Sequence, residues 1–165
     1  MSPETALTAT VQTSANYARQ YPDDEAAAPW LVTSAVLATQ QAVAIALRAA
    51  GDRVPAQAGA TELVLRAATQ DRLPAPFTLP MNTAARRAFE DLVDTRNAFM
   101  HPRGLSWTLA TDVLSKGLLV ASQTIRHLIL TQPVLQDLVA PDQQAVIGDG
   151  LQELETLAEF LDDSV

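Results

Sequence analysis

Three residues suited to chemistry stand close together in the segment 96–101 of this chain: Arg96, Asn97 and His101. Asn97 and His101 are four positions apart, so on a helix they are neighbours on one face, and Arg96 lies at the edge of that face. An imidazole exchanges protons near neutral pH, and a guanidinium binds anions. A cation, an amide and an imidazole would therefore meet at the end of one helix.

The position of Arg96 on that helix is unusual for an arginine. Phe89, Leu92, Arg96 and Phe99 follow the spacing of one buried helical stripe, so Arg96 occupies a place where a core residue is expected. A guanidinium there needs a carboxylate, backbone acceptors or a bound anion, because burying an unpaired charge is costly. Two interpretations stay open. Either Arg96 binds an anion, or it pairs with a nearby acid such as Asp91, Asp112 or Glu155 while His101 merely ends the helix.

Several other kinds of site are excluded or unsupported by the sequence. The chain has no cysteine, which excludes disulfides, thiolate metal sites and cysteine nucleophiles. We find no metal-binding spacing of His, Asp and Glu, no glycine-rich phosphate loop and no supported Ser/His/Asp arrangement. We therefore expect neither a metal nor a cofactor.

Apolar residues recur at helical spacing nearly throughout, and no segment alternates as a strand would. We expect helices over residues 5–21, 30–50, 61–72, 83–101, 106–130 and 141 onward, with a proline-rich connector at 73–80. The predicted fold is all-α, an up-and-down bundle of about five to six helices. Residues 1–25 would form an N-terminal helix or arm, and residues 26–165 the bundle.

The stretch 26–47 has no charged residue and is about as long as a membrane span. Gln40 and Gln41 would then lie near the middle of the bilayer, where unpaired amides are costly. We therefore interpret this stretch as a central bundle helix. The N-terminal residues resemble no signal peptide, and together with the absence of cysteine this predicts a cytoplasmic protein.

The formal net charge of −8 disfavours a broad nucleic-acid-binding surface. The charge is uneven, however. From Asp137 to the end there are eight acidic residues and no basic one, whereas the range from Arg86 to Arg103 holds four arginines against three acids. An anion-binding surface is therefore expected in that range, and the acidic C-terminal residues are expected to form a solvated helix face.

The segment 90–102, with the sequence EDLVDTRNAFMHP, resembles the signature of the HEPN superfamily. That signature is an arginine, a polar residue that is often asparagine, several mostly apolar residues, and a histidine frequently followed by proline. The order of helices is also similar to HEPN domains over roughly residues 26–162, although the specific part is only the motif at 96–101.

The resemblance implies a homodimer with its motifs facing each other and a metal-independent endoribonuclease of a prokaryotic toxin–antitoxin or phage-defence system. His101 would act as proton acceptor and donor, Arg96 would stabilise the charged phosphate, and Asn97 would orient the imidazole or bind a phosphate oxygen. Arg103 and Arg86 would contact the RNA. An antitoxin or regulatory protein would be a further partner, and no membrane is involved.

The sequence departs from the resemblance at one position. Many HEPN toxins carry a tyrosine two residues after the histidine, and Arg103 stands there instead. We therefore do not expect modification by a nucleotidyltransferase. Two alternatives remain: a non-catalytic HEPN-like binding or scaffold module, and an unrelated helical interaction domain.

Residues outside the motif have simpler interpretations. Arg86 and Arg87 could follow an RNA, but ion pairs with Glu90 and Asp91 at i,i+4 explain them as well. His127 is expected on a solvated helix face. The two tryptophans, Trp30 and Trp107, are expected to anchor the core or a dimer interface.

Overall fold

The computed structural model describes residues 1–101, 109–131 and 137–163, and within these ranges the chain is helical and has no strand. The all-α prediction is therefore confirmed. The α-helices of the described residues are α1 (Pro3–Gln20), α2 (Ala28–Ala49), α3 (Ala60–Ala67), α4 (Thr83–Met100), α5 (Thr111–Ile125) and α7 (Pro141–Asp162). A short 3₁₀ helix, η1 (Glu25–Ala27), precedes α2, and a π-helical segment, η2 (Arg126–Thr131), continues α5.

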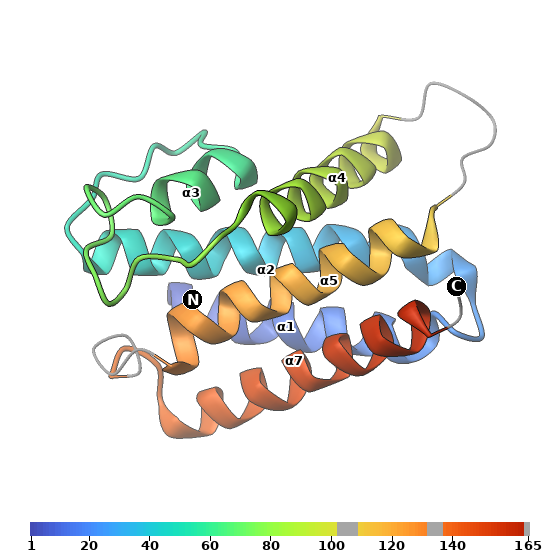
Figure 1. Ribbon diagram of the computed structural model, residues 1–165. Helices are drawn as coiled ribbons and strands as arrows, with labels where there is room; N and C mark the ends of the chain where they lie inside the picture. The colour runs from blue at the N-terminus through green and yellow to red at the C-terminus, as the bar shows by residue number, and fades with distance from the viewer. Residues whose placement is uncertain (102–108, 132–136, 164–165) are drawn as a thin grey trace.

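Four long helices form a closed ring around the core. α2 packs against α1 and α5, and α7 packs against the same two helices from the other side (Figure 1). α4 lies over α2 and α5, outside this ring, and α3 packs against α2 and α4. The segment with the candidate residues is therefore carried by an outer helix supported by two core helices.

The interior is built mainly from alanine, valine and leucine. α2 is buried along most of its length, with Leu31, Val32 and Ala35 among its fully enclosed residues.

The stretch Glu25–Ala49 is long and apolar enough to cross a membrane, and it is the one such stretch among the described residues. However, 67% of its most apolar window is buried against the rest of the chain. This burial agrees with the interpretation of residues 26–47 as a central bundle helix.

Two glycines allow helices to approach closely. A Cβ at Gly117 of α5 would lie 2.8 Å from the Cβ of Leu92 on α4, and a Cβ at Gly150 of α7 would lie 2.6 Å from Cγ1 of Val11 on α1. Both distances are shorter than real Cβ contacts, so any larger residue would force the helices apart. Gly117 thus determines how closely α4 packs against α5.

Most helix boundaries agree with the sequence prediction. α2 ends as expected at Gly51, whose φ of 84° only glycine adopts readily. The amide of Asp52 there donates to the carbonyl of Leu47, which satisfies an otherwise free helix-end acceptor. The predicted cap of α4 is also confirmed, because the side chain of Asn82 accepts from the amide of Ala85 at 2.8 Å.

Two predicted boundaries are wrong. α3 ends at Ala67 instead of residue 72, because the amide of Leu79 in the connector donates to the Ala67 carbonyl at 2.9 Å and takes the place of the next helical bond. α5 begins at Thr111 rather than 106, since Ala110 is extended and acts as its N-cap. The rest of the predicted start lies outside the described residues.

Some expectations for single side chains are also wrong. Trp30 is 58% exposed, so it does not anchor the core, and its place in a dimer interface stays a prediction, whereas Trp107 lies outside the described residues. His127 is partly buried and lies 3.3 Å from the Phe77 carbonyl, instead of on a solvated face. Its helix has changed from α to π geometry at residue 126, which rotates the following side chains away from their expected directions.

Candidate functional site

α4 is held by a narrow apolar stripe along its inner side. Phe89, Leu92 and Val93 are buried, and the deepest of them is Leu92 opposite Gly117. The outer side of α4 is charged, and the ion pair of Arg86 with Glu90 at 2.8 Å is formed as the i,i+4 spacing predicted. Arg86 is therefore engaged within its own helix. No corresponding ion pair joins Arg87 and Asp91 in the described residues, so that half of the prediction is wrong.

Arg96 continues the apolar stripe, one turn beyond Leu92, and is partly buried as the spacing predicted. Its Nε atom is buried and has no hydrogen-bond partner, and no carboxylate of the described residues forms an ion pair with its guanidinium. Two of the acids expected to pair with it have other partners: Asp112 pairs with Lys116, and Glu155 pairs with Arg126. The predicted ion pair of Arg96 with an acid is therefore wrong for the described residues.

Asn97 and His101 lie on the exposed side of the same helix end. His101 is the C-cap of α4, and its amide donates to the Asn97 carbonyl at 3.0 Å. With φ of −130° and ψ of 64°, His101 has already left helical geometry. The last backbone hydrogen bond of α4 thus fixes the backbone of His101 relative to Asn97 and leaves the imidazole in solvent.

The three side chains do not share one direction. Arg96 and His101 are five positions apart, which corresponds to about 140° around a helix axis at 3.6 residues per turn. The next residue on the Arg96 side is Met100, which is 58% exposed. One chain therefore places Asn97 beside His101 and presents Arg96 on an adjoining face, next to an exposed apolar side chain.

The remaining candidate, Arg103, lies outside the described residues. Among the residues that the structure describes, no group of three or more His, Cys, Asp or Glu side chains could hold a metal ion.

The described residues form four cavities of note, one between α1, α2 and α3, one between α4 and α5, and two between α1 and α7. Arg96, Asn97 and His101 line none of these four cavities, and Asn97 and His101 are exposed at the end of α4.

The charge around the motif is balanced, in contrast to the rest of the chain. Within the described α4, three arginines stand against three acids. α7 carries six carboxylates and no basic residue: Asp142, Asp149, Glu153, Glu155, Glu159 and Asp162. The expectation of a solvated acidic face is wrong at Glu155, whose side chain is 16% exposed and is held by Ser122 of α5 and Arg126 of η2.

The structure also shows polar residues that sequence reasoning did not single out as a site. Gln41 and Arg48 of α2 line the cavity between α1, α2 and α3. Their spacing of seven residues could have indicated this shared location, because it places both residues on one side of an otherwise apolar helix.

No family model matches this chain, and neither a curated protein nor a solved structure matches it. The resemblance to the HEPN superfamily therefore depends on the residues of the segment 90–102 and on the order of the helices.

Proposed function

We propose that this chain is a HEPN-like endoribonuclease that needs no metal ion and acts as a homodimer, in a prokaryotic toxin–antitoxin or phage-defence system. The observation that carries this proposal is the state of Arg96. A partly buried guanidinium, with no carboxylate partner among the residues that the structure describes, stands at the same helix end as an exposed amide and an exposed imidazole. A guanidinium that no carboxylate of the described residues neutralises can pair with a phosphate.

The chemistry is cleavage by the neighbouring 2′-hydroxyl. His101 of one protomer removes the 2′-hydroxyl proton, and the oxygen attacks the adjacent phosphorus. The bond from phosphorus to the 5′-oxygen breaks, and the partner's His101 gives a proton to that leaving oxygen. The products are a 2′,3′-cyclic phosphate and a 5′-hydroxyl. Arg96 stabilises the negative charge that builds on the non-bridging oxygens, and Asn97 orients the imidazole or binds one of those oxygens.

A dimer would bring together groups that a single chain directs to different faces. Because Arg96 and His101 point to adjoining faces, one chain does not direct both at one phosphate. Two copies that meet along this end of α4 would bring the Arg96 face of one chain beside the His101 face of the other. Met100, exposed between the two, supplies apolar surface for such a contact.

The test is RNA cleavage in the presence of EDTA. We expect wild-type protein to cleave, and Arg96→Ala and His101→Asn to lose about 10²- to 10⁴-fold in rate while their circular dichroism and unfolding temperatures stay near wild type. Arg53→Ala and His127→Asn are the controls, because Arg53 is an exposed arginine outside α4 and His127 is the second histidine of the chain.

The outcomes separate the two functional classes. Cleavage that survives in both motif variants would sink the enzyme proposal. RNA binding that depends on Arg96 without any cleavage would instead establish the non-catalytic binding module, which the net charge of −8 favours. Sedimentation of the wild-type protein as a monomer at micromolar concentration would contradict the dimer.

A further inference from the structure

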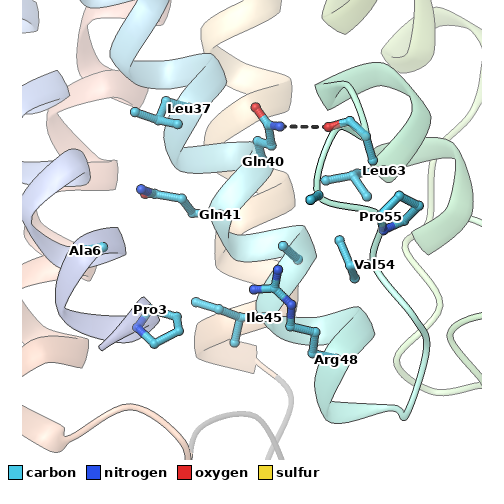
Figure 2. Close-up of a pocket in the computed structure, with 13 residues that line it drawn as sticks. Pro3, Ala6, Leu37, Gln40, Gln41, Ile45, Arg48, Val54, Pro55 and Leu63 are labelled. Carbon is cyan, nitrogen blue, oxygen red and sulfur yellow. Dashed lines mark hydrogen bonds between the residues drawn. The ribbon is translucent and has the colours of Figure 1, made fainter. Parts of the chain in front are cut away.

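The outward side of α2 carries two exposed apolar residues and a cavity. Trp30 is 58% exposed and Leu37 is 43% exposed, and they lie two helical turns apart on that side. From Leu37 onward, a cavity of about 310 Å³ lies between α1, α2 and α3, and Ala44 and Arg48 are among its lining residues. Figure 2 shows Leu37 at one end of this cavity and Arg48 at the other. Trp30, Leu37, Ala44 and Arg48 together form the α2 face.

Trp30 and the cavity lie at equal distances from Leu37. Trp30 precedes Leu37 by seven residues and Ala44 follows it by seven, so each is about 10 Å from Leu37 along the helix axis. A two-fold axis through Leu37 would therefore place Trp30 of each copy over the cavity of the other, which is a closed, self-complementary contact. The cavity volume is at the lower end of those that hold whole small molecules, so one aromatic side chain has room there.

The charges at the two ends of α2 are complementary in the same arrangement. The acidic residues 23–25 are exposed before α2, Arg48 is exposed at its end, and residues 26–47 carry no charge. Neither end forms an ion pair with another residue that the structure describes. Because residues 23–25 lie 12–14 positions before Leu37, they would stand opposite positions 49–51 of an antiparallel partner, beside its Arg48. Opposite charges would then meet at both ends of the contact.

The uncharged middle of α2 matters for a chain with a formal net charge of −8. Two copies of such a chain repel each other, and the repulsion is smallest where neither surface carries a charge. The helix dipole accounts for acids at the start of a helix and a cation at its end, but it does not account for an exposed tryptophan. Spacing, charge and exposure therefore indicate the same occupant for the α2 face, a second copy of this chain.

We propose that two copies of this chain dock through their α2 faces in antiparallel orientation, with Trp30 of each copy in the cavity of the other. Leu37 of both copies would meet on the two-fold axis. The indole would cover Ala44, and the guanidinium of Arg48 would lie against the ring, where a cation is attracted to the aromatic face. None of these residues belongs to α4, so this contact is independent of the proposed ribonuclease site and of its contact at the end of α4.

Cysteine crosslinking tests the register, because the chain has no cysteine of its own. Leu37→Cys protein should be crosslinked into a dimer by a short bismaleimide, since residue 37 would face its copy across the axis. Ala26→Cys protein should not crosslink to itself. Residue 26 lies eleven positions before residue 37, so its two copies would stand about 33 Å apart at opposite ends of the contact. A parallel pair of helices would instead crosslink at residue 26.

Substitutions in the Leu37→Cys chain identify the residues that hold the contact. Trp30→Ala should raise the protein concentration at which half of the chains crosslink by about tenfold or more, as truncation of an interface tryptophan commonly does. Arg48→Glu and Glu25→Arg should each raise it, and the two substitutions in one chain should restore it. Met100→Ala is the matched control, because Met100 is as exposed as Trp30 and belongs to α4.

The substituted residues are exposed, so circular dichroism should show the same helix content in every variant. The proposal is overturned if Leu37→Cys protein does not crosslink at high micromolar concentration, or if Ala26→Cys protein crosslinks to itself. Crosslinking at residue 37 that withstands Trp30→Ala, or that Met100→Ala abolishes, would overturn it as well. Arg96→Ala and His101→Asn should leave crosslinking unchanged, so a failure of the ribonuclease proposal is distinguishable from a failure of this one.

Discussion

At the scale of single residues, the carboxylate of Asp52 shows how an arginine of this chain finds its hydrogen-bond acceptors. Two nitrogens of Arg66 bond its carboxylate, with Nη2 at 2.9 Å from Oδ2, and Arg72 lies 3.5 Å away. The hydrogen bonds from Arg66, followed by the positive charges of Arg66 and Arg72, lower the pKa of Asp52 below its ordinary value of 3.8. The stabilisation is therefore fully present above that value and is lost as pH falls through the lowered pKa.

We expect Asp52→Asn to lower the unfolding temperature at neutral pH, because Arg66 and Arg72 lose their shared carboxylate. The difference from wild type should shrink as pH falls below about 3.8, where the wild-type carboxylate is itself being protonated. Thermal unfolding followed by circular dichroism between pH 7 and pH 2.5 measures this difference. Asp71→Asn, at an exposed acid, is the control. A difference that stays constant over the whole range would contradict the assignment.

The sequence was sufficient to predict where Arg96 stands and insufficient to predict what it touches. Helical spacing gives the side of a helix on which a residue lies, and it placed Arg96 beside Leu92 correctly. Ion-pair partners depend on how helices cross. Glu155 is bonded by Arg126, which is 29 residues away in sequence and on another helix, so no local pattern reveals that Glu155 has a different partner.

At the scale of helices, α7 is joined to its two neighbours by ion pairs of different kinds. Glu155 accepts from Ser122 of α5 and from two nitrogens of Arg126 of η2, which continues α5, and its side chain is 16% exposed. Glu153 meets Arg19 of α1 at 3.0 Å, and both side chains are largely in solvent. The two acids are two positions apart on one helix and differ mainly in burial.

We expect Glu155→Ala to destabilise the protein by about 1–3 kcal/mol, because the buried Ser122 hydroxyl and the Arg126 guanidinium both lose their acceptor. Glu153→Ala should cost less than about 1 kcal/mol, as exposed ion pairs usually do. Urea unfolding at pH 7 compares the two variants directly. Equal losses in both would show that burial does not distinguish these ion pairs.

Helix periodicity and capping residues predicted the bounds of α2, α4 and α7 closely. The predicted end of α3 was wrong because a residue of another segment bonds to its last backbone carbonyl. α3 stops early because Leu79, twelve residues later, occupies the carbonyl of Ala67. The direction of His127 was missed because α5 widens into a π-helix at residue 126. Neither event has a signature in a residue pattern, since both depend on tertiary packing.

At the scale of the whole molecule, α1 closes the ring of four helices. Its residues Leu7 and Val11 are fully buried, and Val11 packs where Gly150 of α7 leaves room for it. Without α1, the facing sides of α2 and α7 would be exposed to water. The first helix therefore contributes to the same core as the rest of the bundle.

We expect a chain beginning at residue 25 to lose several kcal/mol of stability, because burying one leucine or valine side chain contributes about 1.5–3 kcal/mol. It should unfold at a clearly lower temperature than the full chain or be recovered as aggregate. Differential scanning calorimetry of both chains measures this loss. The control is a chain that lacks only Met1, which precedes Ser2, the N-cap of α1. An unchanged unfolding temperature in the shorter chain would instead establish residues 1–25 as an independent arm.

The six carboxylates of α7 have a consequence for how this molecule meets a polyanion in solution. α4 and α7 lie on opposite sides of α5 (Figure 1), so the neutral helix and the strongly negative one face in different directions. A nucleic acid that diffuses toward the protein is repelled least on the α4 side, and the field biases the orientation of each encounter. Added salt shortens the Debye length to about 8 Å at physiological ionic strength, which weakens the repulsion and speeds association.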